Sequence, residues 1–261
     1  MAVRFDLASL KTNGSPVPLV ERALDIETAS FAVTDSGTLA YLPVSSRRND
    51  RRLVWVDANA KGQVEPLPGA TGAFFEPAIS PDSHSVAVTI DGPVESIWIF
   101  DLSRHTRTPF TATTLGTSQA PVWTRDGKRL AYRGTRTGFR NVYWKEVDGS
   151  HDEEQLTTGN NNQTPGSFSL HDQQLVYSDL DLTTRRDIWT IPVAGDRKPI
   201  RYRGLAASEG GPQISPDSQW VAYDSDESGK TEVYVLPFPG PGGKNLQISI
   251  EGGVEPVWSK K

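Results

Sequence analysis

A repeat of about 45 residues constrains the fold of this 261-residue chain more than any other feature of its sequence. Each unit contains a short apolar segment that ends in Ser or Thr, and these end positions recur every 44 to 46 residues. Self-similarity at such a period is typical of repeat architectures, so one repetitive domain is expected. The end positions are Thr34, Ser80, Thr124, Ser169, Ser215 and Ser259.

Three further short runs follow the apolar segment in most units. A turn such as Ser-Pro-Asp-Ser leads into a second run, and a β-branched and aromatic third run lies about 18 to 21 residues after the Ser or Thr. A weaker fourth run ends the unit, and no helical period of 3.6 is present. Four short strands per unit, repeated around a ring, are typical of a β-propeller blade.

The turns after the first strands carry an aspartate at a recurring position. Asp82, Asp126 and Asp217 are expected to accept a backbone N–H from the residue two positions later, as aspartates in tight turns do. Their predicted role is structural and not chemical.

Six units predict an all-β, six-bladed β-propeller in a single domain spanning residues 1–261. The expected blades are residues 30–70, 74–112, 118–158, 163–203, 209–250, and 253–261 together with 1–21. In the last blade, residues 255–258 match a first strand, residues 2–7 a third and residues 18–20 a fourth. No segment remains for the second strand. We therefore expect either a rearranged three-stranded blade or an edge completed by a partner's strand, which would produce a dimer.

Composition and missing motifs exclude several classes of function. The absence of cysteine excludes disulfides, thiolate zinc sites and cysteine nucleophiles, and a net charge of -5 argues against nucleic acid as a partner. No apolar run approaches membrane-spanning length, and the N-terminus lacks the layout of a signal peptide. Nucleophile-elbow, phosphate-loop and paired-histidine motifs are missing. We therefore expect no catalytic residues, although the sequence leaves open whether the protein is an enzyme.

Ligands of propellers usually bind at the central channel, where loops of all blades converge. The residues just before the first strands are therefore the candidate ligand-binding residues at the channel mouth. Two of them, Glu76 and Glu255, are also candidate ligands for one divalent cation such as calcium, which prefers oxygen donors. The alternatives are a water-filled polar channel without any cofactor, and a peptide site. The candidates are Ser30, Glu76, Gln119, Gln163, Glu209 and Glu255.

Three segments, S-P-D-S-x-x-V-A-V (80–88), T-R-D-G-K-R-L-A-Y (124–132) and S-P-D-S-Q-W-V-A-Y (215–223), resemble the repeats of TolB-like propellers, which are related to WD-type propellers. Residues 226–244 and 251–259 are similar to the propeller regions attached to membrane-tethered bacterial serine/threonine kinases. The resemblance implies a rigid ring that binds proteins or other ligands without catalysis. It also implies an extracytoplasmic or periplasmic domain of a larger bacterial protein.

The preferred hypothesis is a non-catalytic interaction module whose channel face binds a peptide, a protein partner or a cell-envelope component. The alternative is a metal-dependent hydrolase or lyase with a cation in the channel, in which Glu76 and Glu255 bind the ion and Gln119 or Gln163 orients the substrate. A third hypothesis is a purely structural propeller that dimerises through its missing strand. Fold alone does not choose among them.

Overall fold

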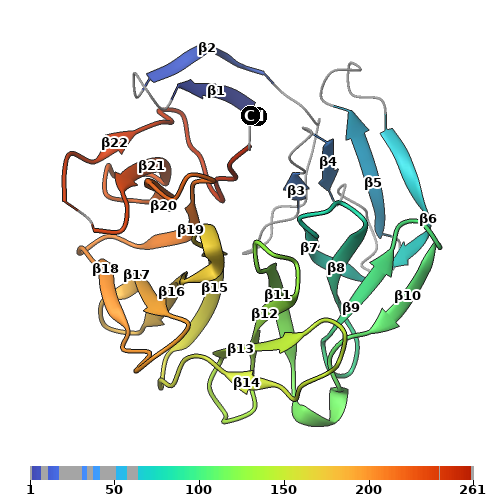
Figure 1. Ribbon diagram of the computed structural model, residues 1–261. Coiled ribbons are helices and arrows are strands. Elements are labelled where there is room, and N and C mark those ends of the chain that lie inside the picture. Colours follow the sequence, from blue (N-terminus) through green and yellow to red (C-terminus); the bar gives the residue numbers. More distant parts are fainter. Residues whose placement is uncertain are drawn as a thin grey trace.

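The computed structural model of this protein describes residues 2–6, 11–17, 31–33, 38–41, 51–57, 64–240 and 242–259. Antiparallel sheets stand around a central axis, and the chain passes through them one after another (Figure 1). In each four-stranded sheet, strands that follow one another in sequence are hydrogen-bonded neighbours. This is the arrangement of propeller blades. The prediction of an all-β propeller is therefore confirmed.

Four blades are described over their whole length, apart from residue 241. The first contains β7 (Phe74–Ile79), β8 (Ser85–Ile90), β9 (Ser96–Asp101) and β10 (Thr106–Pro109). The second contains β11 (Ser118–Trp123), β12 (Arg129–Gly134), β13 (Asn141–Glu146) and β14 (Glu154–Gln155). The third contains β15 (Asn162–Phe168), β16 (Gln174–Asp181), β17 (Arg185–Pro192) and β18 (Ile200–Arg203). The fourth contains β19 (Glu209–Ile214), β20 (Trp220–Ser225), β21 (Glu232–Pro237) and β22 (Leu246–Gln247).

Two further sheets are formed by the N-terminal part of the chain. A four-stranded sheet contains β3 (Phe31–Val33), β4 (Thr38–Tyr41), β5 (Arg51–Asp57) and β6 (Val64–Gly72). A two-stranded sheet contains β1 (Ala2–Asp6) and β2 (Lys11–Val17). The helices of the described residues are two single 3-10 turns, η2 (Thr113–Leu115) and η3 (Leu170–Asp172). Neither is long and apolar enough to cross a membrane.

The prediction of six blades is wrong. Four fully described blades form the ring together with the partly described β3–β6 sheet, and the described residues of the two chain ends do not form the expected three-stranded blade. Instead β1 pairs with β2 alone, with Asp6 opposite Lys11. Residues 255–258 are not a strand, and residues 18–20 lie outside the described part. The physical reason is loop closure: β2 begins five residues after β1 ends, whereas the expected blade needed pairing between opposite ends of the chain.

The hydrophobic core lies between neighbouring blades. Phe168 of β15 stacks on Trp144 of the preceding blade, with ring centroids 6.4 Å apart. Tyr223 of β20 belongs to one buried cluster with Val176 and Ile188 of the preceding blade. Each blade therefore buries apolar surface against its neighbours, which explains why the strand sequences are almost continuously apolar.

The predicted turn aspartates accept the expected hydrogen bonds. The Oδ1 atom of Asp82 accepts one from the N–H of His84 at 3.0 Å, and Asp126 and Asp217 accept equivalent bonds from Lys128 and Gln219. The Ser80 hydroxyl also donates to Asp82, at 2.5 Å, and these bonds hold the pKa of Asp82 below its ordinary value. The structural role predicted for these aspartates is confirmed.

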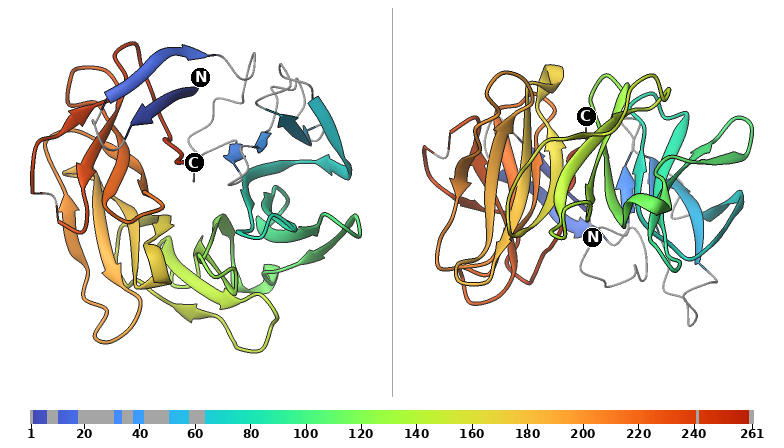
Figure 2. Two further views of the ribbon diagram at one scale, coloured as in Figure 1. Left: turned by 45° about the horizontal axis from the view of Figure 1, so that its top comes forward. Right: turned by 90° about the horizontal axis from the view of Figure 1, so that it is seen from below.

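Hydrogen bonds also join the first strand of a blade to the blade before it. Trp123 donates its indole N–H to the carbonyl oxygen of Ala78, and Trp258 donates in the same way to Gln213. Both bonds span 45 residues. The segment 254–259 therefore lies against β19 as β11 lies against β7, and it extends into the middle of the ring (Figure 2). It occupies the place of a first strand without a second strand paired to it among the described residues.

Candidate functional site

A β-bulge interrupts the first strand of every fully described blade, at the level of the central channel. In β7, Glu76 and Pro77 together oppose the single residue Val88. Glu76 has a φ of +48°, in the left-handed region that residues with side chains rarely adopt. Proline suits the next position, because a bulge leaves a backbone N–H out of the ladder. The same positive φ recurs at Ala120, Gly211 and Glu255, each also followed by proline.

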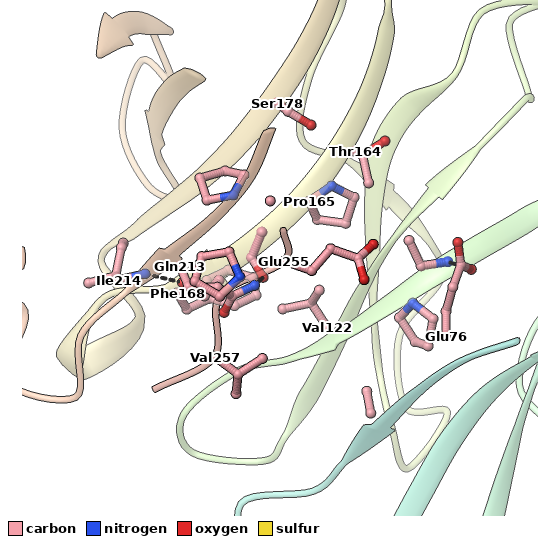
Figure 3. A pocket seen from close by; sticks show the side chains of 18 of the residues that line it. Glu76, Val122, Thr164, Pro165, Phe168, Ser178, Gln213, Ile214, Glu255 and Val257 are labelled. Atoms are coloured by element: carbon pink, nitrogen blue, oxygen red, sulfur yellow. Dashed lines mark hydrogen bonds between the residues drawn. The ribbon is translucent and has the colours of Figure 1, made fainter. Parts of the chain in front are cut away.

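The bulges surround a cavity of about 870 Å³, which we call the channel cavity. Its wall is formed by all four described blades and by the C-terminal segment, and Figure 3 shows the side chain of Glu255 pointing into it. Cavities of several hundred cubic ångströms are large enough to take a ligand or a short peptide segment. The wall combines apolar side chains such as Val122 and Val257 with charged groups, so it suits an amphipathic ligand.

Glu76 is buried in this wall and carries an ion pair. Its carboxylate accepts hydrogen bonds from the Thr89 hydroxyl at 2.7 Å, the Ala120 N–H at 2.6 Å and the Arg133 guanidinium at 3.2 Å. The last two donors belong to the next blade, so Glu76 joins two blades. A cation at Glu76 would have to replace these donors, and the Arg133 charge would repel it.

Glu255 lies across the cavity on the C-terminal segment. Its backbone N–H donates to Asp224 Oδ2 at 3.1 Å, which fixes the segment to β20. Asp224 is buried, and this burial raises the pKa of its carboxyl above the ordinary value. The described residues contain no group of three or more His, Asp or Glu side chains arranged to hold a metal ion. A divalent cation at Glu76 and Glu255 stays a prediction without structural support.

The remaining candidates that the structure describes do not line the channel cavity. Gln119 lies behind the wall and accepts a hydrogen bond from Arg133 Nε at 2.8 Å, which positions the cavity-lining side chain of Arg133. Gln163 is buried and donates to Asp179 at 2.8 Å. Glu209 is fully buried between blades, and Ser30 lies outside the described residues. The structure thus brings Glu76 and Glu255 to one cavity and places Gln119, Gln163 and Glu209 outside its wall.

Glu209 has an unusual environment for a carboxyl group. Its side chain has no exposed surface, Oε1 accepts the Leu205 N–H at 3.1 Å, and Oε2 has no hydrogen-bond partner among the described atoms. Burial, together with the negative charge of Asp187, raises the pKa of Glu209 to about 7. The folded protein therefore binds this proton more tightly than the unfolded chain does.

Replacing Glu209 by glutamine is expected to stabilise the fold above pH 7. The neutral acid stabilises the wild type fully below pH 4.5, the ordinary glutamate value, and this contribution is lost as the pH rises through about 7. Glu209→Gln keeps an acceptor for Leu205 and has no charge to bury, so it should gain about 2 kcal/mol at pH 8. Urea denaturation from pH 4.5 to 8 measures this. Exposed Glu251→Gln is the control, and equal pH slopes in wild type and Glu209→Gln would disprove the effect.

Sequence reasoning missed four arginines that line the channel cavity, namely Arg125 in the turn after β11 and a group of three. Arg133 stands near the end of β12, Arg140 directly before β13, and Arg186 is the second residue of β17. They lie where second strands end and third strands begin, which is one end of the cavity. The search for candidates considered only residues before first strands. The 46-residue interval between Arg140 and Arg186 was a usable signal.

Fold and site together define a β-propeller with a charged central cavity. The chain is 25% identical over 196 residues to the Tol-Pal system protein TolB of Wolinella succinogenes, covering 70% of this chain and 46% of that protein. A solved TolB structure from Acinetobacter baumannii matches 88% of this chain and 57% of that one, with a TM-score of 0.73 and 19% identity. One from Agrobacterium tumefaciens matches 84% and 79%, with a TM-score of 0.71 and 20% identity. No protein-family model matches the chain. The fold is that of a TolB-like β-propeller.

Proposed function

We propose that this chain is a non-catalytic binding module whose channel cavity takes an exposed segment of a protein partner. The observation that carries the proposal is the cavity itself, which has about 870 Å³ of volume and a wall of both charged and apolar side chains. Similarity to a protein of the Tol-Pal system supports a protein as the partner and a location outside the cytoplasm. The matched region spans less than half of that relative, so activity and partners of the whole protein are part of this proposal.

Rigid repeat geometry supports a preformed binding site. The wall positions come from successive blades that are tied by hydrogen bonds and buried aromatic contacts, so the cavity is largely formed before a ligand arrives. A preformed site loses little conformational entropy on binding. The metal-dependent hydrolase remains an alternative from the sequence, and no observation here favours it. The kinase-linked origin and dimerisation through the edge of the C-terminal segment also stay predictions.

Filling the cavity entrance should abolish binding. Asn162 is exposed, lines the cavity and makes no side-chain hydrogen bond within the described part of the chain, so Asn162→Trp adds bulk there without removing such a bond. Peptides selected from a random twelve-residue display library on wild-type protein should bind this variant at least about 10-fold more weakly. Leu182→Trp is the control, since Leu182 is 98% exposed and lies outside the cavity.

Two results would refute the proposed function. One is that the library yields no enriched peptide on the wild-type protein. The other is that enriched peptides bind Asn162→Trp and Leu182→Trp with equal affinity, which would place their binding site elsewhere on the surface. Thermal unfolding of both variants checks that each retains the fold.

A further inference from the structure

Two of the channel arginines differ from every other charged group described in the cavity wall. Arg133 donates to Glu76, Gln119 and Thr164, and Arg125 donates to the backbone oxygens of Phe168 and Ile214. Arg140 and Arg186 make no side-chain hydrogen bond or ion pair within the described part of the chain. Their guanidinium groups are therefore available to a ligand.

The repeat places these two arginines at equivalent positions. Arg140 stands two residues before Val142 of β13, and Arg186 stands two residues before Ile188 of β17. Val142 opposes Arg133 of β12, and Ile188 opposes Ser178 of β16. Ser178 lies 45 residues after Arg133, which is one repeat. Adjacent blades therefore direct the two side chains to the same end of the channel cavity.

The backbone fixes both arginines at the wall. The carbonyl oxygen of Arg140 accepts the Gln163 N–H at 2.7 Å, which ties this residue to the next blade. The guanidinium of Arg186 lies over Gly210, where an added Cβ would meet Nη1 at 2.8 Å and Asp224 Oδ1 at 2.9 Å. Glycine at position 210 thus leaves the space that Arg186 occupies, and the neighbouring Asp224 attracts it without a direct ion pair.

The electrostatics of this end are positive. The charges of Arg140 and Arg186 both act on Arg133, whose pKa is lowered first by burial and further by these two like charges. Of the acidic groups close by, Glu76 pairs with Arg133, and Asp226 pairs with Arg185 at 2.9 Å. Asp224 accepts the Glu255 N–H and attracts Arg186 without a direct ion pair. An anion entering between Arg140 and Arg186 would relieve this repulsion.

We propose, on the basis of the proposed function, that Arg140 and Arg186 bind a carboxylate of the inserted segment, so that the ligand is an acidic peptide. Guanidinium groups donate two parallel hydrogen bonds to a carboxylate, which gives both charge and orientation. A phosphate has the same acceptor geometry. Its second charge would face Asp224 and Glu255 in the same wall, which favours the singly charged group.

The test has a direct part that needs no selected peptide. N-acetylglutamate amide, which has one carboxylate, is titrated at millimolar concentration while the Nε–Hε NMR signals of the arginines are recorded. The signals of Arg140 and Arg186 should shift together and saturate, whereas Arg104, whose side chain is 80% exposed, should not respond. Absence of any shift at Arg140 and Arg186 would overturn the carboxylate site.

The second part uses peptides whose binding Asn162→Trp abolishes. Each is compared with versions carrying Gln or Asn for Glu or Asp, phosphoserine at the same position, or an amidated C-terminus. The acidic side-chain form should bind about 10- to 100-fold more tightly than the neutral form, and Arg140→Gln/Arg186→Gln should remove this preference. The control variant Arg104→Gln/Lys198→Gln removes two positive charges from exposed positions and should leave the preference for acidic peptides unchanged.

The outcomes separate this inference from the proposed function. If neutral peptides bind as tightly as acidic ones but remain sensitive to Asn162→Trp, the channel function stands and the carboxylate inference fails. If the phosphoserine form binds most tightly, the carboxylate inference also fails. If only amidation of the C-terminus weakens binding, the carboxylate that the arginines bind is the one at the end of the peptide chain. If no peptide binds but the NMR signals of Arg140 and Arg186 respond to N-acetylglutamate amide, the peptide function is refuted and an anion site remains.

Discussion

Glu76→Ala should destabilise the protein by about 3–5 kcal/mol, because it leaves the buried Arg133 without its counter-charge. The side chains of Glu76 and Arg133 are 7% and 12% exposed, so water from the channel cavity replaces the lost partner only in part. The variant also removes the acceptor for the Ala120 N–H, which joins two blades. A chain of this size should show a lower unfolding midpoint by about 10 °C in calorimetry.

Two further variants separate charge from shape at this position. Glu76→Gln retains acceptors for Thr89 and Ala120 and should lose less stability than Glu76→Ala. Glu76→Ala/Arg133→Met removes the unpaired charge and should recover part of the loss, which a double-mutant cycle quantifies. Equal stability of Glu76→Ala and wild type would show that the ion pair contributes nothing to blade contact.

Gly166→Ala should destabilise the protein by about 3 kcal/mol, because the first strands of two neighbouring blades approach too closely there for a side chain. A Cβ at position 166 would lie 2.1 Å from the carbonyl oxygen of Pro212 and 3.0 Å from that of Val176. Both obstacles are backbone atoms, which cannot rotate away as a side chain would. The blades would have to separate, and this would also stretch the bond that Ile214 N–H donates to Ser167 at 2.7 Å.

Denaturant unfolding of Gly166→Ala is best compared with that of Gly92→Ala. A Cβ at Gly92 would have only one neighbour within 4 Å, the Val94 oxygen at 3.8 Å, so it should be tolerated. If both variants unfold at the same denaturant concentration, the close approach of the first strands is not rigid.

The blade strands were predictable because their sequence signals are local. Runs such as 97–100 and 188–191 are β-branched and aromatic, and both lie within strands. Strand β18 gave no clear sequence signal, because arginines alternate with apolar residues in Ile200–Arg203 and only one of its four residues is buried. The sixth blade was wrongly predicted because the strand-like sequence of residues 2–7 does not determine which segment they pair with.

The site was harder to predict than the fold. The position four residues before each Ser or Thr identified Glu76 and Glu255 as cavity residues, since that position is the bulge. Side chains one residue earlier, such as Gln119, point away from the cavity because successive residues of a strand face opposite sides. Arg140 and Arg186 stand at the starts of third strands, and only the three-dimensional alignment of blades shows that they share a wall with the bulges.

Most hydrogen bonds between blades couple nearest neighbours. Trp123, Ile214 and Trp258 each bond to the blade directly before their own, whereas Arg125 bonds to the next blade at Phe168 and also to the blade after that at Ile214. In such a system the free energy of each unit depends on its own stability and on two interface terms. Damage to one interface therefore loosens two adjacent blades while the far side of the ring keeps its shape, and ligand binding between blades is transmitted mainly to immediate neighbours.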